Sequence, residues 1–269
     1  MQKILVPTDF SANADNATQF AIDIANKFGS EVRLLHSFHI SSRRADVMKN
    51  MGKAVRSESE GKMSKAILKF KPMLEKNASI SGEVIVGPAV TNTVHYAGKE
   101  GCTLIVMGTQ GATGALEVFI GSTTGGVLKN TKVPVLAIPS GFDRRPFKNI
   151  VLALDNQALP SQGVFSPLQQ LAAGYGSDVN IFHLRAEGEE KSIDETAYAY
   201  LEGLQVNFHE KVGSADVHER INAFVRDASS NLLCMVRRKR GFFEGLFKGS
   251  TTLKQVYNSP VPLLALIGD

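Results

Sequence analysis

Glycine and hydroxyl residues gather in one part of the chain, in a pattern suited to binding phosphate. Residues 108–114 contain three glycines, and the segment 121–126 adds three more together with a serine and two threonines. Gly108 and Gly111 let the backbone approach a ligand and adopt positive φ. Gly121-Ser122 is typical of a helix start, where free N–H groups and the positive end of the helix dipole attract anions. The pattern favours a phosphate cradle to which the hydroxyls add donors. The alternative is a flexible loop capped by a serine.

Two common phosphate-binding motifs are absent from the sequence. A dinucleotide-binding fold has its glycines directly after the first strand. Here the first apolar run continues into residues 7–11, and no glycine occurs before Gly29. There is no G-x-x-x-x-G-K-[ST] P-loop either. The lack of glycines after the first strand also argues against an ATP-pyrophosphatase of related fold.

Short apolar runs alternate with helical patterns along the whole chain. In the first half we expect strands at 2–7, 31–38, 82–87, 103–108 and 133–138, and helices at 13–28, 50–77, 91–100 and 122–130. In the second half we expect strands at 148–154, 178–184, 205–211, 231–236 and 261–266. Strands rich in Val, Ile and Leu that alternate with helices indicate a parallel sheet covered on both faces. The sequence therefore predicts the α/β class.

The two halves match each other in four segments that occur in the same order. The matched pairs are 4–9 with 150–155, 29–36 with 176–183, 121–124 with 249–252, and 133–138 with 261–266. Such an ordered set indicates an internal duplication, with domains at 1–140 and 147–269 and a short linker at 141–146. The last apolar run of each half is a candidate sheet edge, so we expect the repeats to pair there as an internal pseudo-dimer. A homodimer of the whole chain is an open alternative.

The carboxyl ends of the strands are where a ligand is expected. Open parallel sheets bind ligands beyond these ends, at the point where the strand order reverses. Asp9 ends the first strand with the glycine-rich loop opposite, so its carboxylate is placed to contact the ligand. Asp155 has no such loop opposite, and we expect it to cap the following segment. His36 and His183 end matching strands, where a partly buried structural role is the simpler interpretation.

The glycine spacing resembles that of a known family. Gly108, two residues, Gly111, nine residues and Gly121-Ser122 match the G-2x-G-9x-G-[ST] ATP-binding motif of the universal stress protein family. The chain resembles this family once in each half. The resemblance implies two repeated doubly wound domains of the adenine nucleotide alpha hydrolase-like type, each with a five-stranded parallel sheet of order 3-2-1-4-5. It also implies ATP or AMP as the ligand of the first repeat, with Mg²⁺ as a further option.

The same resemblance implies a set of binding residues in the first repeat. Asp9 and the backbone at Ser37 and Phe38 would face the adenine. Gly108 and Gly111 would lie along the ribose and the phosphates. The phosphates would be held by Gly121, Ser122, Thr123 and Thr124, and the set is completed by Pro7, Thr8, Met107 and Thr109.

The second half departs from the motif. Ungapped alignment places Val236, Lys239 and Phe242 opposite the three loop glycines, and only the segment 249–252 is kept. Side chains at those positions would occupy the space that a nucleotide needs, so we expect this site to be degenerate. The basic segment 237–240 could clamp a different anion with its side chains. A solvated loop or a contact surface is the simpler alternative.

Composition and charge narrow the classes of function. Hydrophobic residues make up 43% of the chain and charged residues 21%, as in a folded protein with a real core. The net charge of +4 is too small to indicate nucleic acid as a partner. No apolar run approaches the roughly 20 residues of a membrane span, and the first residues lack the pattern of a signal peptide. We expect a cytoplasmic protein in which Cys102 and Cys234 are buried, reduced thiols, with no structural zinc site.

These observations favour a stress-response or regulatory protein that binds ATP or AMP, with little or no catalysis. Phosphoryl transfer needs a metal-held phosphate chain and a residue that orients the nucleophile, and Asp9 is the only obvious carboxylate at the site. Slow ATP hydrolysis, or autophosphorylation of Ser122 or a neighbouring threonine, stays open. The remaining alternative, from another class, is a nucleotide-free scaffold that acts through protein contacts.

The substitution Gly111→Val should abolish nucleotide binding and leave the fold intact. A branched side chain there would keep backbone N–H groups from reaching phosphate oxygens, and each such bond is worth roughly 1.5–3 kcal/mol. Ser122→Ala removes one hydroxyl and should have a smaller effect. Calorimetric titration with ATP measures the loss, and far-UV circular dichroism checks the fold. A folded Gly111→Val protein with wild-type affinity would mean that the glycine-rich loop is structural.

Overall fold

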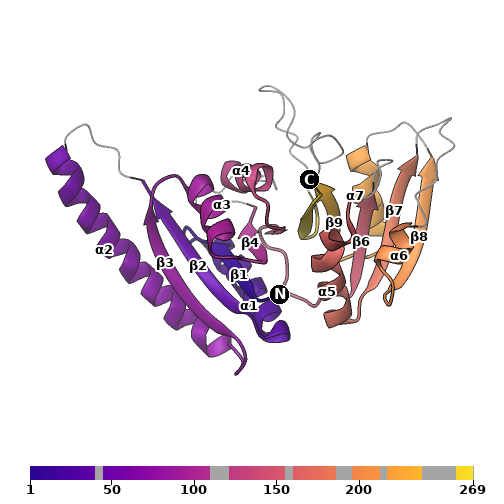
Figure 1. Ribbon diagram of the computed structural model, residues 1–269, viewed down its shortest axis with the longest axis horizontal. Helices are drawn as coiled ribbons and strands as arrows, with labels where there is room; N and C mark the ends of the chain where they lie inside the picture. The colour runs from indigo at the N-terminus through magenta and orange to yellow at the C-terminus, as the bar shows by residue number, and fades with distance from the viewer. Residues whose placement is uncertain are drawn as a thin grey trace. The chain divides into compact units, whose positions relative to one another are not determined.

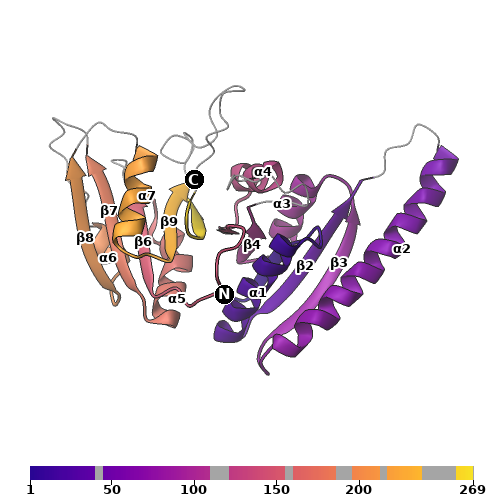
Figure 2. The same ribbon diagram turned by 180° about the vertical axis from the view of Figure 1, so that it is seen from behind.

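The structure is a computed structural model that describes residues 1–39, 45–109, 121–154, 160–185, 196–212, 217–237 and 259–268. Contacts divide these residues into two compact units, one made of 1–109 and 121–133 and the other beginning at 134 (Figures 1 and 2). Each unit contains parallel strands that alternate with helices.

The described residues of the first unit form four strands and four α-helices. Its elements are β1 (Lys3–Pro7), α1 (Ala12–Phe28), β2 (Glu31–Phe38), α2 (Ala45–Phe70), β3 (Ser79–Val86), α3 (Ala89–Lys99), β4 (Leu104–Gly108) and α4 (Ser122–Asn130). The strands run parallel in the order β3-β2-β1-β4. Helices α1 and α3 lie on opposite faces of the sheet, as Figures 1 and 2 show from the two sides. This is the start of the predicted order 3-2-1-4-5.

The second unit repeats the plan. Its elements are β5 (Val135–Ile138), β6 (Asn149–Leu154), α5 (Ser166–Tyr175), β7 (Asp178–Arg185), α6 (Thr196–Tyr200), β8 (Gln205–Val212), α7 (Val217–Asp227), β9 (Leu232–Arg237) and β10 (Leu263–Ile267). Five of the strands run parallel in the order β8-β7-β6-β9-β10, which is the predicted order 3-2-1-4-5. The predicted doubly wound α/β class is confirmed.

Strand β5 belongs to the second compact unit, where it pairs with β10. The pairing is antiparallel, with Ala137 opposite Leu263 and Val135 opposite Ala265. All of β5 is buried. The two segments expected to form pairing edges, 133–138 and 261–266, are thus hydrogen-bonded to each other. The domains at 1–140 and 147–269 stay a prediction from the sequence repeats.

Two elements differ from their predicted boundaries by three residues or more. Strand β3 begins at Ser79 rather than at 82, because its pairing with β2 already starts with Ser79 opposite Glu31. Helix α2 begins at Ala45 rather than at 50, and it ends at Phe70 rather than at 77. The reason for the earlier end is Pro72, which lies in a 3-10 turn after the helix and has no N–H to extend it.

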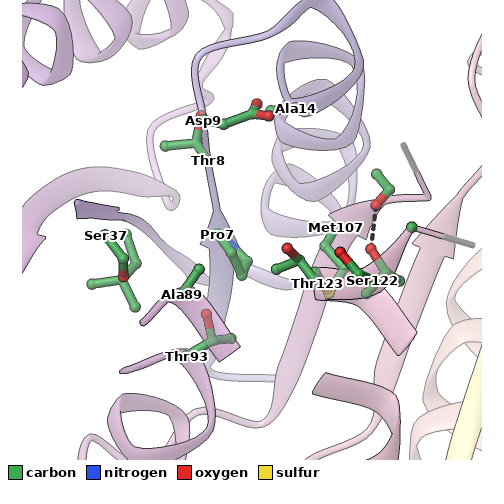
Figure 3. Close-up of a pocket in the computed structure, with 14 residues that line it drawn as sticks. Pro7, Thr8, Asp9, Ala14, Ser37, Ala89, Thr93, Met107, Ser122 and Thr123 are labelled. Carbon is green, nitrogen blue, oxygen red and sulfur yellow. Dashed lines mark hydrogen bonds between the residues drawn. The ribbon is translucent and has the colours of Figure 1, made fainter. Parts of the chain in front are cut away.

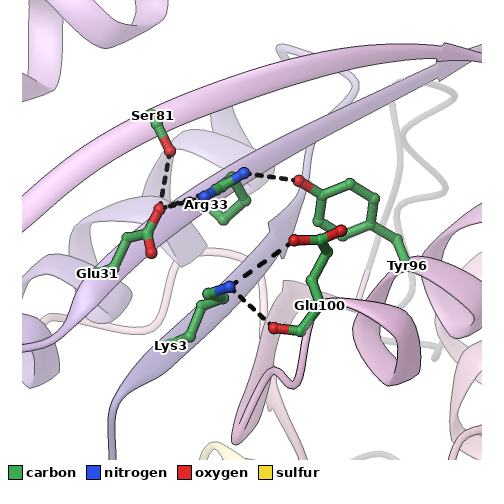
Figure 4. Close-up of polar contacts among 6 residues, drawn as sticks. All are labelled: Lys3, Glu31, Arg33, Ser81, Tyr96 and Glu100. Atoms are coloured by element: carbon green, nitrogen blue, oxygen red, sulfur yellow. Dashed lines mark hydrogen bonds and ion pairs between the residues drawn. The ribbon is translucent and has the colours of Figure 1, made fainter.

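A polar network joins the first three strands to α3. Its members are Lys3, Glu31, Arg33, Ser81, Tyr96 and Glu100 (Figure 4). Arg33 Nε donates to Glu31 Oε1 at 2.9 Å, and Arg33 Nη1 donates to the Tyr96 hydroxyl at 3.0 Å. Lys3 Nζ donates to the Glu100 carbonyl at 2.8 Å. Burial, together with the Glu83 carboxylate, raises the pKa of Tyr96 to about 12. Helix α3 is therefore attached to the sheet through charged groups.

The matching place in the second unit carries Asn149, Asn180 and His209 where the first has Lys3, Arg33 and Glu83. Asn180 Nδ2 donates to Asn149 Oδ1 at 2.7 Å, and His209 Nε2 donates to Asn180 Oδ1 at 3.1 Å. The ring of Phe224, on α7, lies 4.9 Å from the His209 ring and is stacked on Phe182 at a centroid distance of 4.6 Å. The corresponding helices α3 and α7 thus contact their sheets differently, α3 through charged groups and α7 through an aromatic ring.

Both sheets are covered by apolar side chains, and both cysteines lie in these cores. In the first unit Phe20 and Ile24 of α1 pack beside the fully buried residues of β1. Cys102 and Cys234 are free thiols and are buried, as predicted. Within the described parts of the chain, no helix has both the length and the apolar character that crossing a membrane requires.

Both thiols should be unreactive in the native protein. Burial raises the pKa of Cys102 and of Cys234, and the thiolate is the reactive form. An aromatic disulfide reagent at pH 8 should therefore label neither cysteine until guanidinium unfolds the chain, after which two thiols per chain should react. Rapid labelling of the folded protein would contradict the burial of these side chains.

Candidate functional site

A cavity of about 370 Å³ opens at the carboxyl ends of the first unit's strands (Figure 3). It lies beside β1, which pairs with β2 on one side and with β4 on the other, so that the strand order reverses there. Its lining consists of Pro7, Thr8, Asp9, Ala14, Leu35, Ser37, Ala89, Thr93, Met107, Gly108, Gly121, Ser122, Thr123 and Thr124. The cavity occupies the place at which ligands bind in open parallel sheets.

Ten of the thirteen residues expected at the site line this cavity. Phe38 does not, because side chains alternate along a strand and Ser37 takes the cavity side. Thr109 is buried next to the cavity, and its carbonyl accepts a hydrogen bond from Gly121 N at 2.5 Å. Gly111 falls outside the described residues, as do Asp155 and the segments 238–240 and 249–252.

Four lining residues were missed by the sequence analysis. They are Ala14, Leu35, Ala89 and Thr93. Leu35 stands two residues before Ser37, so strand alternation alone places both on the same side. Ala89 and Thr93 are four residues apart at the start of α3, and therefore share one helix face. Strand alternation was thus available in the sequence and would have found Leu35, whereas the face that Ala89 and Thr93 share could not be assigned to the cavity from spacing alone, and Ala89 lies before the helix predicted at 91–100.

The start of α4 supplies the hydrogen-bond donors of the cavity. Its N-cap residue, Gly121, offers no side-chain cap, and the first intrahelical bond runs from Gly125 N to the Gly121 carbonyl at 2.9 Å. The N–H groups of Ser122, Thr123 and Thr124 therefore have no intrahelical acceptor. The side chains of Ser122 and Thr123 are exposed in the cavity.

The hydroxyl of Thr124 has a different task from the one expected. It donates to the Gly108 carbonyl at 2.7 Å and ties the start of α4 to the end of β4. The side chain is buried, with 3% exposed. Thr124 can thus offer a ligand its backbone N–H, while its hydroxyl holds the cradle in place.

Gly108 also leaves room for a neighbouring side chain, that of Asn13. A Cβ atom at this position would lie 2.4 Å from Asn13 Nδ2 and 2.7 Å from Asn13 Cγ. Helix α1 therefore passes so close to the end of β4 that only a glycine fits without a shift of the Asn13 side chain. The sequence analysis expected the glycine for the approach of a ligand and for positive φ, and the second expectation is wrong, because Gly108 does not have a positive φ.

The turn after β1 places Asp9 at the other side of the cavity. Thr8 N donates to the Leu35 carbonyl at 2.9 Å, which extends the pairing of β1 with β2. Ser11 N donates to Asp9 Oδ1 at 3.0 Å, and Ser11 Oγ caps α1 by accepting from Ala14 N at 3.3 Å. The carboxylate is exposed at the cavity (Figure 3).

Ser37 presents an oriented hydroxyl at the same side. Asn92 Nδ2 donates to Ser37 Oγ at 3.2 Å and to the Val86 carbonyl, also at 3.2 Å. Since the Ser37 oxygen accepts from Asn92, its own proton is directed elsewhere. Ser37 can therefore act as a donor toward an acceptor atom of a ligand.

The described lining carries one charged side chain, Asp9, and no lysine or arginine. Nor do the described residues contain a group of three His, Cys, Asp or Glu side chains that could hold a metal ion. An anion in the cavity would consequently be held by backbone N–H groups and hydroxyls at the start of α4. Apolar groups of Leu35, Ala89 and Met107 form the remaining walls.

Fold and cavity together define a tandem α/β protein with a ligand site at the strand-order switch of its first unit. The profile of the universal stress protein family matches residues 1–139 and 164–266. The chain belongs to this family and is a tandem member of it.

Individual relatives agree with this membership. The chain is 31% identical over 138 residues to a universal stress protein of Methanocaldococcus jannaschii, an alignment that covers 51% of this chain and 81% of the relative. It is 27% identical over 152 residues to a second universal stress protein of the same organism, covering 51% of this chain and 94% of that one. A universal stress protein structure from Archaeoglobus fulgidus aligns with 99% of this chain and 97% of its own length. The TM-score is 0.66 at 22% identity, which supports the fold.

Gly108→Ala should destabilise the protein even without a nucleotide. The added methyl group presses on Asn13, and overpacking of this kind costs about 1–3 kcal/mol. The loss should be largely relieved in the double variant with Asn13→Ala. Urea unfolding of the nucleotide-free protein measures both, with Gly98→Ala as a control, because a Cβ there meets no atom within 4 Å. Wild-type stability of Gly108→Ala would show that Asn13 does not impose the glycine.

Proposed function

We propose that the protein is a cytoplasmic stress-response or regulatory protein that binds ATP or AMP in its first repeat, with little or no catalysis. One observation carries the proposal: the N–H groups at the start of α4 and the Asp9 carboxylate face the same cavity of about 370 Å³. One side of the cavity suits an anion, and the other suits a group that donates hydrogen bonds.

An adenine nucleotide satisfies both sides. Its phosphates would meet the N–H groups of residues 122–124 and the hydroxyls of Ser122 and Thr123, where the helix dipole also favours negative charge. Its amino or ribose hydroxyl groups would donate to Asp9, and Ser37 would donate to a ring nitrogen or a ribose oxygen. Leu35 and Met107 offer apolar surface to the base. Mg²⁺ would enter with ATP, held mainly by phosphate oxygens and water, since Asp9 is the one carboxylate in the described lining.

The same lining supports a binding role over an enzymatic one. Hydrolysis requires a residue that positions a water in line with the terminal phosphate, and transfer needs a base near the accepting hydroxyl. Among the described lining residues, Asp9 alone could accept a proton. It comes from the end of β1, whereas the phosphates are expected at the start of α4.

The second repeat has larger apolar side chains at the positions that match the cavity wall. Leu154 stands where the first repeat has Thr8, Phe182 replaces Leu35, Ile221 replaces Thr93, and Val236 replaces Gly108. Leu154, Phe182 and Ile221 are each at least 98% buried. This filling supports one nucleotide per chain.

The β5–β10 pairing supports the proposal that the repeats pair as an internal pseudo-dimer.

Calorimetric titration with ATP, ADP and AMP should give one nucleotide per chain. The expected affinity is micromolar, or about −8 kcal/mol, because a few backbone hydrogen bonds and one carboxylate contact hold the ligand. Two equivalent sites would contradict the degenerate second repeat. No heat and no shift in melting temperature with any of the three would replace this proposal with the nucleotide-free scaffold.

A further inference from the structure

The turn that carries Asp9 contains a backbone conformation that a phenylalanine rarely adopts. Phe10 has a φ of 62°, in the left-handed region. A bulky side chain is disfavoured there by contact between Cβ and the backbone, so the conformation persists only where the surroundings hold it. Ser11, the next residue, is already extended as the N-cap of α1. The chain thus reverses at Phe10, between the end of β1 and the start of α1.

His36, at the end of β2, holds both flanks of Asp9. Its ring lies against the Phe10 ring, with the centroids 4.5 Å apart. Its Nδ1 donates to the Thr8 carbonyl at 2.8 Å. Phe10 N in turn donates to Thr8 Oγ1 at 3.0 Å. One histidine side chain therefore contacts the residue before Asp9 and the residue after it.

This double contact limits where the Asp9 carboxylate can lie. With Thr8 and Phe10 both fixed, the backbone of Asp9 has little freedom, and Ser11 N holds one carboxylate oxygen at 3.0 Å. An exposed side chain would otherwise lose rotamer entropy when a ligand binds, which weakens affinity. Fixing the turn in advance removes part of that cost.

We propose that His36 and Phe10 are positioning residues, which fix the Asp9 carboxylate at the cavity so that it accepts a hydrogen bond from the bound nucleotide. This inference rests on the proposed function. It gives His36 a role in ligand binding, whereas the sequence analysis interpreted it as a structural residue. His36 and Phe10 are absent from the cavity lining and act through Asp9.

The second repeat offers a matched control. His183 lies two residues before the end of β7, as His36 lies two residues before the end of β2, and its Nδ1 lies 3.3 Å from the Leu154 carbonyl, the counterpart of the Thr8 contact. The cavity wall around it is filled by apolar side chains. A substitution of His183 therefore tests what loss of such a histidine does to the protein apart from the nucleotide site.

A double-mutant cycle with ATP tests the positioning role. His36→Phe keeps a ring against Phe10 and removes the donor to Thr8. Asp9→Asn keeps the acceptor for Ser11 N and removes the charge. Each single change should raise the Kd for ATP about tenfold. The double variant should bind within about twofold of Asp9→Asn alone, because His36 acts only through that carboxylate. His36→Asn, which restores a donor near the Nδ1 position, should recover part of the loss, and His183→Phe should bind as wild type.

Hydrogen exchange of the nucleotide-free protein gives a second readout. In His36→Phe the Ser11 amide should lose protection, while amides in the middle of α1 keep theirs. Additive losses in the cycle, or an unchanged Ser11 amide, would overturn the inference. Failure of the wild type to bind any nucleotide would overturn the proposed function instead, and exchange at Ser11 would still decide whether His36 holds the turn.

Discussion

Strand β1 hydrogen-bonds to β2 along one edge and to β4 along the other, and all three run in the same direction. The chain that leaves β1 enters α1 on one face of the sheet. Helix α3 lies on the opposite face, where it packs against α4. Where the strand order of a parallel sheet reverses, the chain leaves the two neighbouring strands toward opposite faces, and a space remains beyond their carboxyl ends. The cavity, the place of Asp9 at one side and the place of Gly108 at the other all follow from this pairing.

The cradle at that point is made largely of backbone, and the backbone is held by short local bonds. Gly121 N is bonded to the Thr109 carbonyl, and the Thr124 hydroxyl is bonded to the Gly108 carbonyl. These two bonds fix the start of α4 against the end of β4. A site of this kind depends little on long, mobile side chains. In its described part the geometry is fixed by bonds within the protein, and preorganisation of this kind generally lowers the entropic cost of binding.

Sequence periodicity was sufficient for the α/β class and for most of the strands, because both depend on which residues are apolar and on their spacing. The strand order of β6 to β10 and the ten lining residues came from the resemblance to the family, through the spacing of its glycine motif. Other features depend on contacts between distant segments. The contact of Asn13 with Gly108 is an example, because nothing in the local sequence of α1 or of β4 predicts that these residues lie close together. The left-handed φ of Phe10 is another, because tertiary contact with His36 overrides the preference of a bulky residue.

Helices α3 and α7 contact their sheets through different residues, and this difference disfavours the exchange of strands between the two repeats during folding. Repeats with interchangeable strands risk exchanging them during folding, which is a characteristic failure of such proteins. If β8 took the place of β3, Arg33 and Tyr96 would face Asn207 and His209 instead of Ser81 and Glu83. The reverse exchange would set Glu83 opposite Phe182 and deprive Asn180 of His209. Each exchange leaves half-buried polar groups with fewer hydrogen bonds, which makes the free energy of folding less favourable. Because the polar residues around β3 differ from those around β8, each repeat favours its own edge strand over that of the other repeat.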